Sequence, residues 1–578
     1  MRNRQLWALF LTALFVATFA IGLRAAGQAV PGDDLTAIRT RLAQLEHRLH
    51  KAEALRDVKR LQYSYAHYAE SGLWMDLGDL FATNGVAHYV QGDYRGPEAL
   101  RKFYLQELGR GQMGLAEGRI YPHIMIQPVV TVAGDGRTAK GRWHVIAMLG
   151  SYGTSASWAG VVYENRYVFE DGAWRIEDLS FSSQYSGRYS PPALSVPKWE
   201  LPPHYAAQSA GDPAPAGASV IADASLASAN FGQLQQRYRD LALRAQQLRD
   251  EVGVLNIQHS YGYAFDQKDW AAVANLFASD GTLELGQRGV YAGKDRIRKA
   301  LGVLEGEGLA EGEVHDHLQL ATVVHVASGA KTANVRGVQL SVTGVKGSGA
   351  QWEEGIFENT YVKQGDVWKI RSVHYYPRVI TAYEQGWAND AKPAPGPSVA
   401  FPPDRPSTET YDIYPKMYYP RFHYANPVTH KAVQYPPGIH ATLEETKQTV
   451  VPATSPRNVK EFTERLNGLE EQIRLSIDYD AVENLVSASG YSLDESGSER
   501  SNIHQTVQPV IQIASDGKSA AVRARLLNID GKAGELAGGL YEGRAISRNG
   551  VWSLENMALK PVWSSPFAKW TPVIGRGH

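Results

Sequence analysis

Apolar residues recur every three or four positions in three long segments of the chain, which is the spacing of an amphipathic helix. These positions are Leu35, Ile38, Leu42, Leu45 and Leu49 in the first segment, Leu234, Tyr238, Leu241, Ala245, Leu248, Val252 and Leu255 in the second, and Phe462, Leu466, Leu469 and Ile473 in the third. Each segment predicts a long helix with one apolar face. The heptad-like spacing of the first two is also compatible with coiled-coil contacts between units or between subunits.

After each predicted helix, apolar and polar residues alternate with a period of two, as they do in half-buried strands. Asp-Gly pairs at 135–136 and 516–517 stand where a tight hairpin turn is needed. A helical start followed by a curved antiparallel sheet is an α+β fold, in which the helices close one face of the sheet over a cavity.

The chain repeats this pattern three times. In each copy a Glu stands ten residues before a Trp, and these pairs are Glu164 and Trp174, Glu358 and Trp368, and Glu542 and Trp552. Upstream, residues 126–139 and 507–520 are near copies, and residues 320–333 are a weaker third copy. We therefore expect three tandem α+β units.

Pro-rich stretches separate the predicted units and are too poor in periodic apolar residues to fold alone. We expect a first unit at 33–192, a linker at 193–225, a second unit at 226–391, a Pro/Tyr-rich extended linker at 392–457 and a third unit at 458–578. Because exposing so many tyrosines would be unfavourable, the second linker is expected to lie on a neighbouring unit.

The N-terminus is typical of a secretory signal peptide. Arg2 and Arg4 precede an apolar run from Leu6 to Leu23, and small residues follow, which predicts removal of residues 1–29. The expected location is then the periplasm or the outside of the cell. Since the run has about the length that spans a bilayer, an uncleaved membrane anchor is the alternative.

Composition narrows the class of protein further. With 43% hydrophobic residues, 59 Lys plus Arg and 60 Asp plus Glu, the chain is a folded globular protein without the basic excess that attracts nucleic acid. The absence of cysteine removes disulfides, thiolate nucleophiles and Cys-bound zinc. Catalysis would have to use His, carboxylates, hydroxyls or Lys.

The phrase YAFDQKDWAAVANLFASDGTLEL at 263–285, a His before the first long strand and the terminal Gly-x-Trp strand resemble the SnoaL-like branch of the nuclear transport factor 2 superfamily. The resemblance implies cone-shaped units. The SnoaL-like branch includes enzymes such as scytalone dehydratase and hexachlorocyclohexane dehydrochlorinase, alongside members without catalysis. By similarity to those enzymes, Asp266 would pair with His317 in the second unit. A carboxylate beside an imidazole fixes its tautomer and stabilises its charged form, so the His can act as a base.

The same spacing suggests a second pair in the first unit. Glu70 stands eleven residues before Phe81, as Asp266 does before Phe277, and His123 precedes Tyr163 by forty residues, as His317 precedes Phe357. Tyr89 falls where the dehydratase has a water-activating Tyr, whereas the second unit has Leu285 there.

The third unit is expected to be catalytically silent. His504 remains at its first strand, but the residue eleven before Val486 is Leu475, and the helical insert expected near 95–108 and 294–304 is missing. A His that persists without an acid also allows a purely structural role for this position.

Other His and Glu residues give weaker indications of a functional role. His315 and His317 point the same way on one strand, but no third ligand accompanies them, so we expect no metal and no cofactor. His144 and His374 are expected to be hydrogen-bonded sheet residues. Glu164, Glu358 and Glu542 recur in all units and are expected to be structural.

Two functions from different classes remain open. The first is an exported lyase or isomerase that removes a proton from a small apolar or aromatic molecule, causing dehydration, dehydrohalogenation or a double-bond shift. The second is a non-catalytic protein that binds a small molecule or assembles with itself, for example as a homo-oligomer through the lead-in helices. A polyketide-cyclase-like or hydrolase activity is a further alternative.

Overall fold

The computed structural model describes residues 32–190, 224–327, 329–439, 453–496 and 502–575. The predicted signal peptide and residues 193–223 of the predicted linker lie outside these residues. In the described part of the chain, no helix is both long enough and apolar enough to cross a membrane.

The first unit begins with the 40-residue helix α1 (Gly32–Ser71) and continues into a seven-stranded sheet. Its further elements are α2 (Trp74–Asp79), β1 (Phe81–Tyr89), β2 (Gly92–Arg95), α3 (Gly96–Phe103), the π-helix η1 (Tyr104–Leu108), β3 (Arg119–Ile120), β4 (His123–Val132), β5 (Thr138–Ser151), β6 (Ser155–Glu170) and β7 (Ala173–Arg188). The strand order is β2-β1-β7-β6-β5-β3, and β4 pairs with β5.

The second unit repeats this plan after the short helix α4 (Ala224–Ala227). Its elements are α5 (Phe231–Asp266), α6 (Trp270–Leu276), β8 (Phe277–Leu285), the 3-10 helix η2 (Gly286–Arg288), β9 (Val290–Ala292), α7 (Lys294–Glu305), β10 (Glu313–Val326), β11 (Thr332–Val345), β12 (Gly349–Gln364), β13 (Val367–Ala382) and α8 (Gly386–Asn389). The sheet order is β10-β11-β12-β13-β8-β9.

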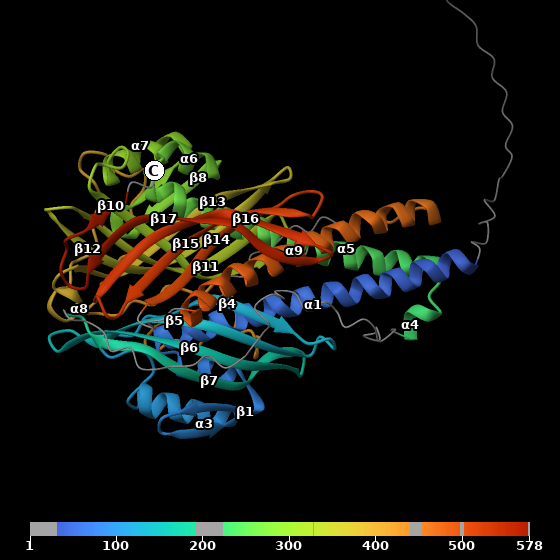
Figure 1. Cartoon of the computed structure of the whole chain (residues 1–578), viewed down its shortest axis with the longest axis horizontal. Coiled ribbons are helices and arrows are strands. Elements are labelled where there is room, and N and C mark those ends of the chain that lie inside the picture. The colour runs from blue at the N-terminus through green and yellow to red at the C-terminus, as the bar shows by residue number, and fades with distance from the viewer. Residues whose placement is uncertain (1–31, 191–223, 328, 440–452, 497–501, 576–578) are drawn as a thin grey trace, which may run out of the picture.

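The third unit is reduced to one helix and one sheet. It consists of α9 (Val459–Ser496), β14 (Asn502–Ile513), β15 (Ser519–Asp530), β16 (Glu535–Arg548), β17 (Val551–Pro566) and β18 (Val573–Ile574). Within its described residues there is no counterpart of α3 or α7, as predicted. The fold class predicted from the sequence, three α+β units with long lead-in helices, is confirmed (Figure 1).

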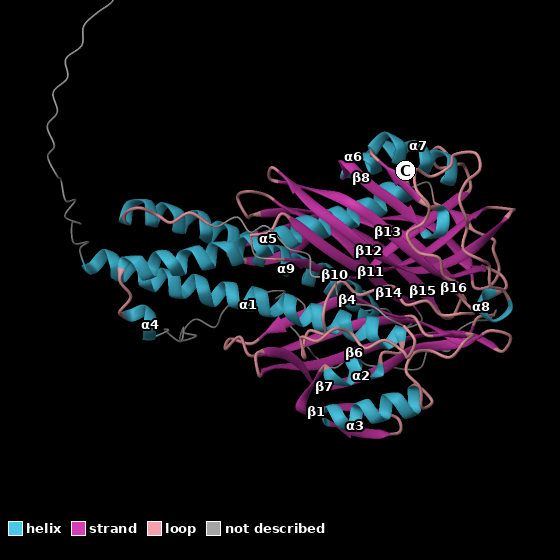
Figure 2. Cartoon of the chain, turned by 180° about the vertical axis from the view of Figure 1, so that it is seen from behind, coloured by secondary structure: helices cyan, strands magenta, loops and turns pink. Residues whose placement is uncertain are grey.

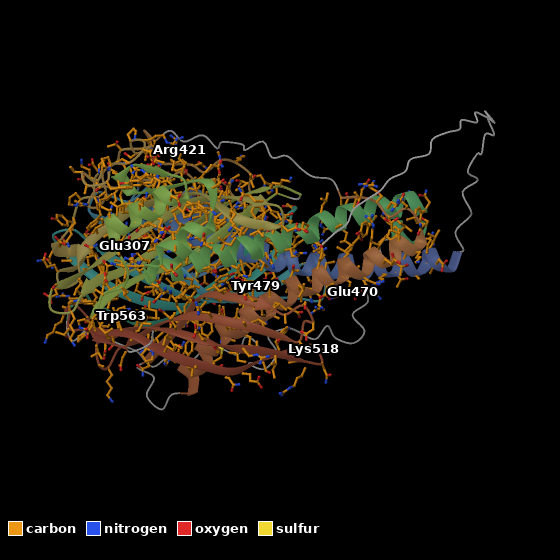
Figure 3. All side chains as sticks on the ribbon, turned by 90° about the horizontal axis from the view of Figure 1, so that it is seen from above. Glu307, Arg421, Glu470, Tyr479, Lys518 and Trp563 are labelled. Carbon is orange, nitrogen blue, oxygen red and sulfur yellow. The ribbon has the colours of Figure 1, made fainter. Side chains whose placement is uncertain are left out.

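The three long helices pack on one another and project beyond the sheets as a stalk (Figures 1 and 2). Most of the residues with helical spacing noted above, from Ile38 to Leu49, Leu234 to Leu248 and Phe462 to Ile473, form its buried core together with Ala52, Leu226 and Ala229. Figure 3 places Glu470 on the stalk and Trp563 among the sheets at the far end of the molecule. The apolar faces that suggested association between units are thus used within a single chain.

The units form a closed ring around a common axis. Each lead-in helix packs on the first long strand of its own unit and also on that of another unit: α1 on β10, α5 on β14 and α9 on β4. These three strands share a bulge, at which Gln127, Ala321 and Gln508 adopt φ of +54°, +47° and +53°. The ring is therefore a pseudo-threefold arrangement made by one chain.

Contacts at the bulges run in one direction around the ring. The Tyr491 hydroxyl of the third unit donates to the backbone oxygen of Gln127, and the Tyr263 hydroxyl of the second unit donates to that of Gln508. In the first unit, His67 Nε2 lies 2.9 Å from the backbone oxygen of Ala321. Each unit is thereby held by the helix of another.

The Tyr- and Pro-rich strap, residues 392–439, lies on the first and second units. Phe422, Tyr424, Val428 and Val433 belong to the core of the first unit. This placement agrees with the expectation that the segment covers a neighbouring unit.

The recurrent Glu residues are structural. Glu164, Glu358 and Glu542 each form an ion pair with an arginine directly opposite on the neighbouring strand, and these arginines are Arg142, Arg336 and Arg523. Cross-strand pairs of opposite charge stabilise a sheet.

Candidate active site in the second unit

Asp266 and His317 meet inside the second unit. Asp266 is the last residue of α5, and His317 lies near the start of β10 on the face that points toward that helix. The backbone N–H of His317 donates to Asp266 Oδ1 over 2.8 Å, and His317 Nδ1 lies 3.1 Å from the same oxygen. The predicted pair is therefore brought together.

The geometry defines the tautomer of His317. An ionised carboxylate only accepts hydrogen bonds, so Nδ1 carries the proton that it donates to Asp266, and Nε2 keeps a lone pair. Burial, together with the neighbouring His315 and Lys268, lowers the pKa of His317 well below the ordinary value. The imidazole is neutral at pH 7 and can accept a proton at Nε2.

Aromatic side chains surround this imidazole. The rings of Phe265 and His317 meet edge to face with centroids 4.9 Å apart, and Phe265 also stacks on His315. Trp270 meets Phe265 edge to face with ring centroids 5.2 Å apart. These residues belong to the apolar core of the cone, and the His317 side chain is only 9% exposed.

A residue of the third unit completes the surroundings of Asp266. Arg525, on β15, forms ion pairs with Asp266 and with Asp316, and it is almost fully buried. Trp563 Nε1 donates to the other Asp316 oxygen over 2.9 Å. Burial lowers the pKa of Arg525 to about 10 and raises that of Asp316 to about 6.

The predicted pair in the first unit is not formed. Glu70 Oε1 lies 2.9 Å from His67 Nδ1, and Glu70 also pairs with Arg378 of the second unit at 3.3 Å. Burial would raise the pKa of Glu70, but Arg378 and His67 outweigh it and lower that pKa. In the described part of the chain no hydrogen bond joins Glu70 to His123, whose Nε2 lies 3.2 Å from the Tyr163 hydroxyl.

Tyr89 lies in a buried network of hydroxyl groups in the first unit. Its oxygen is 3.2 Å from those of both Tyr65 and Tyr104. Burial raises the pKa of Tyr89 well above the ordinary value, so this hydroxyl stays protonated.

The prediction that the third unit lacks an acid is wrong. Asp494 Oδ1 accepts the backbone N–H of His504 over 2.8 Å and lies 2.9 Å from His504 Nδ1, which repeats the geometry of Asp266 and His317. Leu475 lies more than five helical turns before this acid. The phrase Tyr491-x-x-Asp494, matching Tyr263-x-x-Asp266, would have identified it.

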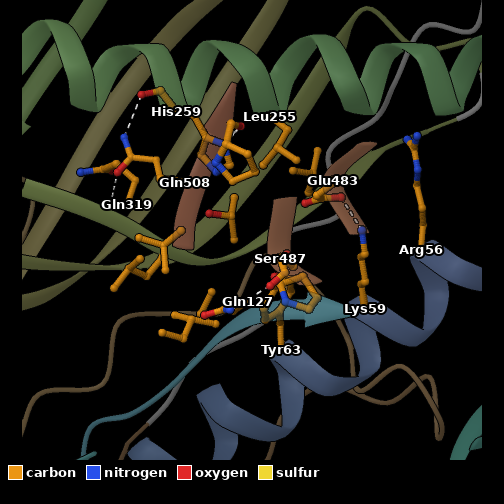
Figure 4. Close-up of a pocket in the computed structure, with 18 of the residues that line it drawn as sticks. Arg56, Lys59, Tyr63, Gln127, Leu255, His259, Gln319, Glu483, Ser487 and Gln508 are labelled. Atoms are coloured by element: carbon orange, nitrogen blue, oxygen red, sulfur yellow. Dashed lines mark hydrogen bonds and ion pairs between the residues drawn. The ribbon is translucent and has the colours of Figure 1, made fainter. Parts of the chain in front are cut away.

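The three prominent cavities lie between units, and none has Asp266 or His317 in its lining. A cavity of about 90 Å³ on the ring axis is lined by all three units (Figure 4). A cleft of about 580 Å³ separates α5 and α6 from the outer face of the third sheet, and a space of about 20 Å³ adjoins Glu70.

The prediction that no third ligand accompanies His315 and His317 is wrong, because Asp266, at the end of α5, lies beside both histidines of β10. One ligand atom from each of Asp266, His315 and His317 lies within 4.8 Å of the others, and all three residues are buried. His144 Nδ1 lies 3.1 Å from Gln127 Oε1, and His374 stacks on Tyr376, so both behave as sheet residues.

Comparison with known proteins agrees with this fold. Residues 50–180 and 246–374 match the SnoaL-like domain family, so the chain carries two SnoaL-like domains of the nuclear transport factor 2-like superfamily. No curated protein matches the chain.

Solved structures of similar single domains include three with high coverage of their own length. A protein from Novosphingobium aromaticivorans provisionally named a scytalone dehydratase is 21% identical over 26% of this chain and 95% of its own, with a TM-score of 0.22. A type 2 hexachlorocyclohexane dehydrochlorinase is 14% identical over 23% and 89%, with a TM-score of 0.21. A nuclear transport factor 2-like protein with a cystatin-like fold, also from N. aromaticivorans, is 20% identical over 26% and 91%, with a TM-score of 0.20.

Proposed function

We propose that the protein is a cofactor-independent lyase or isomerase whose active site is the Asp266–His317 pair of the second unit. The observation that supports this proposal is that Asp266 binds His317 through Nδ1, which leaves the Nε2 lone pair inside an aromatic cone. The first unit is the weaker candidate because Glu70 is bound to His67 and Arg378.

The proposed reaction begins with proton transfer from carbon. His317 Nε2 takes a proton from a carbon next to a carbonyl or another electron-withdrawing group, and the C–H electron pair becomes the new double bond. A halide leaves the adjacent carbon with the electron pair of the C–halogen bond, whereas a hydroxyl takes the abstracted proton back from Nε2 of the imidazolium and leaves as water with the electron pair of the C–O bond. Asp266 stays ionised and stabilises the imidazolium.

The proposed substrate is a small apolar or aromatic molecule. Phe265, Trp270 and the rest of the apolar core around His317 offer contact surface to such a molecule and few hydrogen-bonding groups. Because His317 is nearly enclosed, the proposal requires that side chains at the mouth of the cone move apart when the substrate enters.

The test is turnover of two probes by the purified full chain. Chloride release from γ-hexachlorocyclohexane reports dehydrohalogenation, and the absorbance of a conjugated enone formed from a β-hydroxy aryl ketone reports dehydration. Formation of either product faster than without protein supports the proposal. Absence of both products, with unchanged probes recovered, argues against elimination chemistry.

A second candidate function is binding without catalysis. It is favoured by the Asp494–His504 pair, because the third unit has the same geometry but, within its described residues, none of the helices that close a cone. Tight binding of an apolar fluorescent probe without any turnover would support this candidate.

We also propose that the protein works outside the cytoplasm. The proposal rests on Arg2, Arg4 and the apolar run 6–23 with its small-residue cleavage site. Mass spectrometry of the mature N-terminus in the native host would show residue 30 as the first residue, and an intact residue 1 would contradict cleavage.

A further inference from the structure

We propose that Asp266, His315 and His317 form a binding site for a divalent transition-metal ion such as Zn²⁺ or Co²⁺. Two imidazoles and one carboxylate are ligands that these ions prefer. The proposal does not depend on the reaction proposed above, since it concerns metal binding alone.

His315 is the observation that points to a ligand. It is 7% exposed, and neither of its ring nitrogens has a hydrogen-bond partner among the described residues. An unpaired buried polar atom destabilises the folded state, so such a side chain calls for an explanation. Its ring centroid lies 4.3 Å from that of His317, so the unpaired nitrogens are next to the other two groups.

Comparison of the three units shows that the fold itself does not require this histidine. The position two residues before the shared strand histidine is Tyr121 in the first unit, His315 in the second and Asn502 in the third. The third unit keeps the acid–His pair without the extra imidazole. Only the second unit therefore combines all three groups.

The distances suit capture of an ion after small side-chain movements. Atoms within 4.8 Å of one another need to approach to roughly 3.5 Å to share an ion at bond lengths of about 2.1 Å. His315 can move without breaking a hydrogen bond. Glu305 Oε2, which lies 3.8 Å from His315 Nε2, is close enough to orient that ring.

The positive charges next to the site are paired with carboxylates, so they do not prevent a cation from binding. Arg525 also pairs with Asp316, and it keeps this partner when Asp266 turns toward an ion. Lys268 is bound to Glu313 at 2.6 Å. Both nearby cations are thus balanced by carboxylates other than Asp266.

A bound ion would coordinate the His317 imidazole, which the proposed elimination uses as its base. Metal binding and proton abstraction therefore exclude each other at any one moment. Zn²⁺ would inhibit the reaction, whereas a protein without elimination activity would still bind Zn²⁺, so failure of one proposal is distinguishable from failure of the other.

The test is metal titration of the tag-free full chain. Calorimetry with Zn²⁺ is expected to show one strong site per chain, and His315→Asn, which installs the residue of the third unit, is expected to weaken it by more than about 100-fold. His504→Asn is the matched control and is expected to bind like the wild type. Circular dichroism establishes that each variant is folded.

Three results would overturn the proposal: no Zn²⁺ binding by the wild type, unchanged binding by His315→Asn, or equal loss in His504→Asn. Co²⁺ gives a second readout on the wild type alone, which keeps the proposal testable if a variant fails to fold. Visible absorption bands of a nitrogen- and oxygen-bound Co²⁺ are expected, and the spectrum of free aqueous Co²⁺ would contradict the site.

Discussion

Asp494 receives two hydrogen bonds from His504, one from the backbone N–H at 2.8 Å and one from Nδ1 at 2.9 Å. The corresponding distances from His317 to Asp266 are 2.8 Å and 3.1 Å. In both units the acid ties the end of the long helix to the start of the first strand. The pair is thus part of the fold, and any chemistry depends on what surrounds it.

Loss of Arg525 is expected to destabilise the protein strongly. Arg525→Met leaves Asp266 and Asp316 without their shared buried cation, which typically costs about 3–5 kcal/mol. Arg523→Met is the matched control, since Arg523 lies two residues away, is 51% exposed and pairs with Glu542 at the surface. Denaturation midpoints that fall equally in both variants would contradict a special role for Arg525.

The close approach of α9 to the first unit depends on Gly490. A Cβ atom there would lie 2.3 Å from Gln127 Nε2 and 2.7 Å from the backbone oxygen of His504. Gly490→Ala is therefore expected to cost about 1–3 kcal/mol in thermal or chemical unfolding. In the same helix nothing lies within 4 Å of a Cβ at Gly468, so Gly468→Ala is expected to stabilise by about 0.5–1 kcal/mol. If Gly490→Ala instead raised the unfolding free energy, the contact of α9 with Gln127 at this position would not be tightly packed.

Buried histidines are expected to make the fold sensitive to acid. Burial, reinforced by Arg142, lowers the pKa of His144 to about 3, whereas an unfolded His titrates near 6.5. Between these values the unfolded chain binds a proton that the folded chain does not, so stability falls as the pH falls from 6.5.

His144→Gln removes the group that takes up this proton on unfolding. The fall in the unfolding free energy between pH 7 and pH 5 is therefore expected to be smaller in the variant by about 2 kcal/mol. The measurement is urea unfolding at several pH values. Parallel curves for the variant and the wild type would mean that the pKa of His144 is the same in the folded and unfolded chains, which would contradict this prediction.

Much of the fold could be predicted from the sequence because the repeats constrain each other. The helical stripes, for example Leu234 to Leu248, became the core of the stalk, and the Glu–Trp spacing identified three similar sheets. Asp266 and His317 could be paired because the phrase around 263–285 carries the family pattern with its spacing intact.

The partners of Glu70 and Arg525 depend on contacts between units, which the spacing of residues in the sequence does not encode. Glu70 turned to His67 and Arg378, and the latter comes from another unit more than three hundred residues away. Asp494 was missed because the third unit lacks the segment from which residues were counted in the other two. Arg525 follows no motif, and its role appears only in the folded chain, where its side chain pairs with Asp266 at the end of α5.

The most direct test of the central claim compares two equivalent histidines in one assay. With a substrate that undergoes elimination, His317→Gln is expected to lower kcat by about 100-fold or more, the usual contribution of a general base. His504→Gln is expected to stay within about twofold of the wild type, because its unit lacks a closed cone. Equal activities of His317→Gln and the wild type, or equal losses in both variants, would contradict catalysis by the second unit.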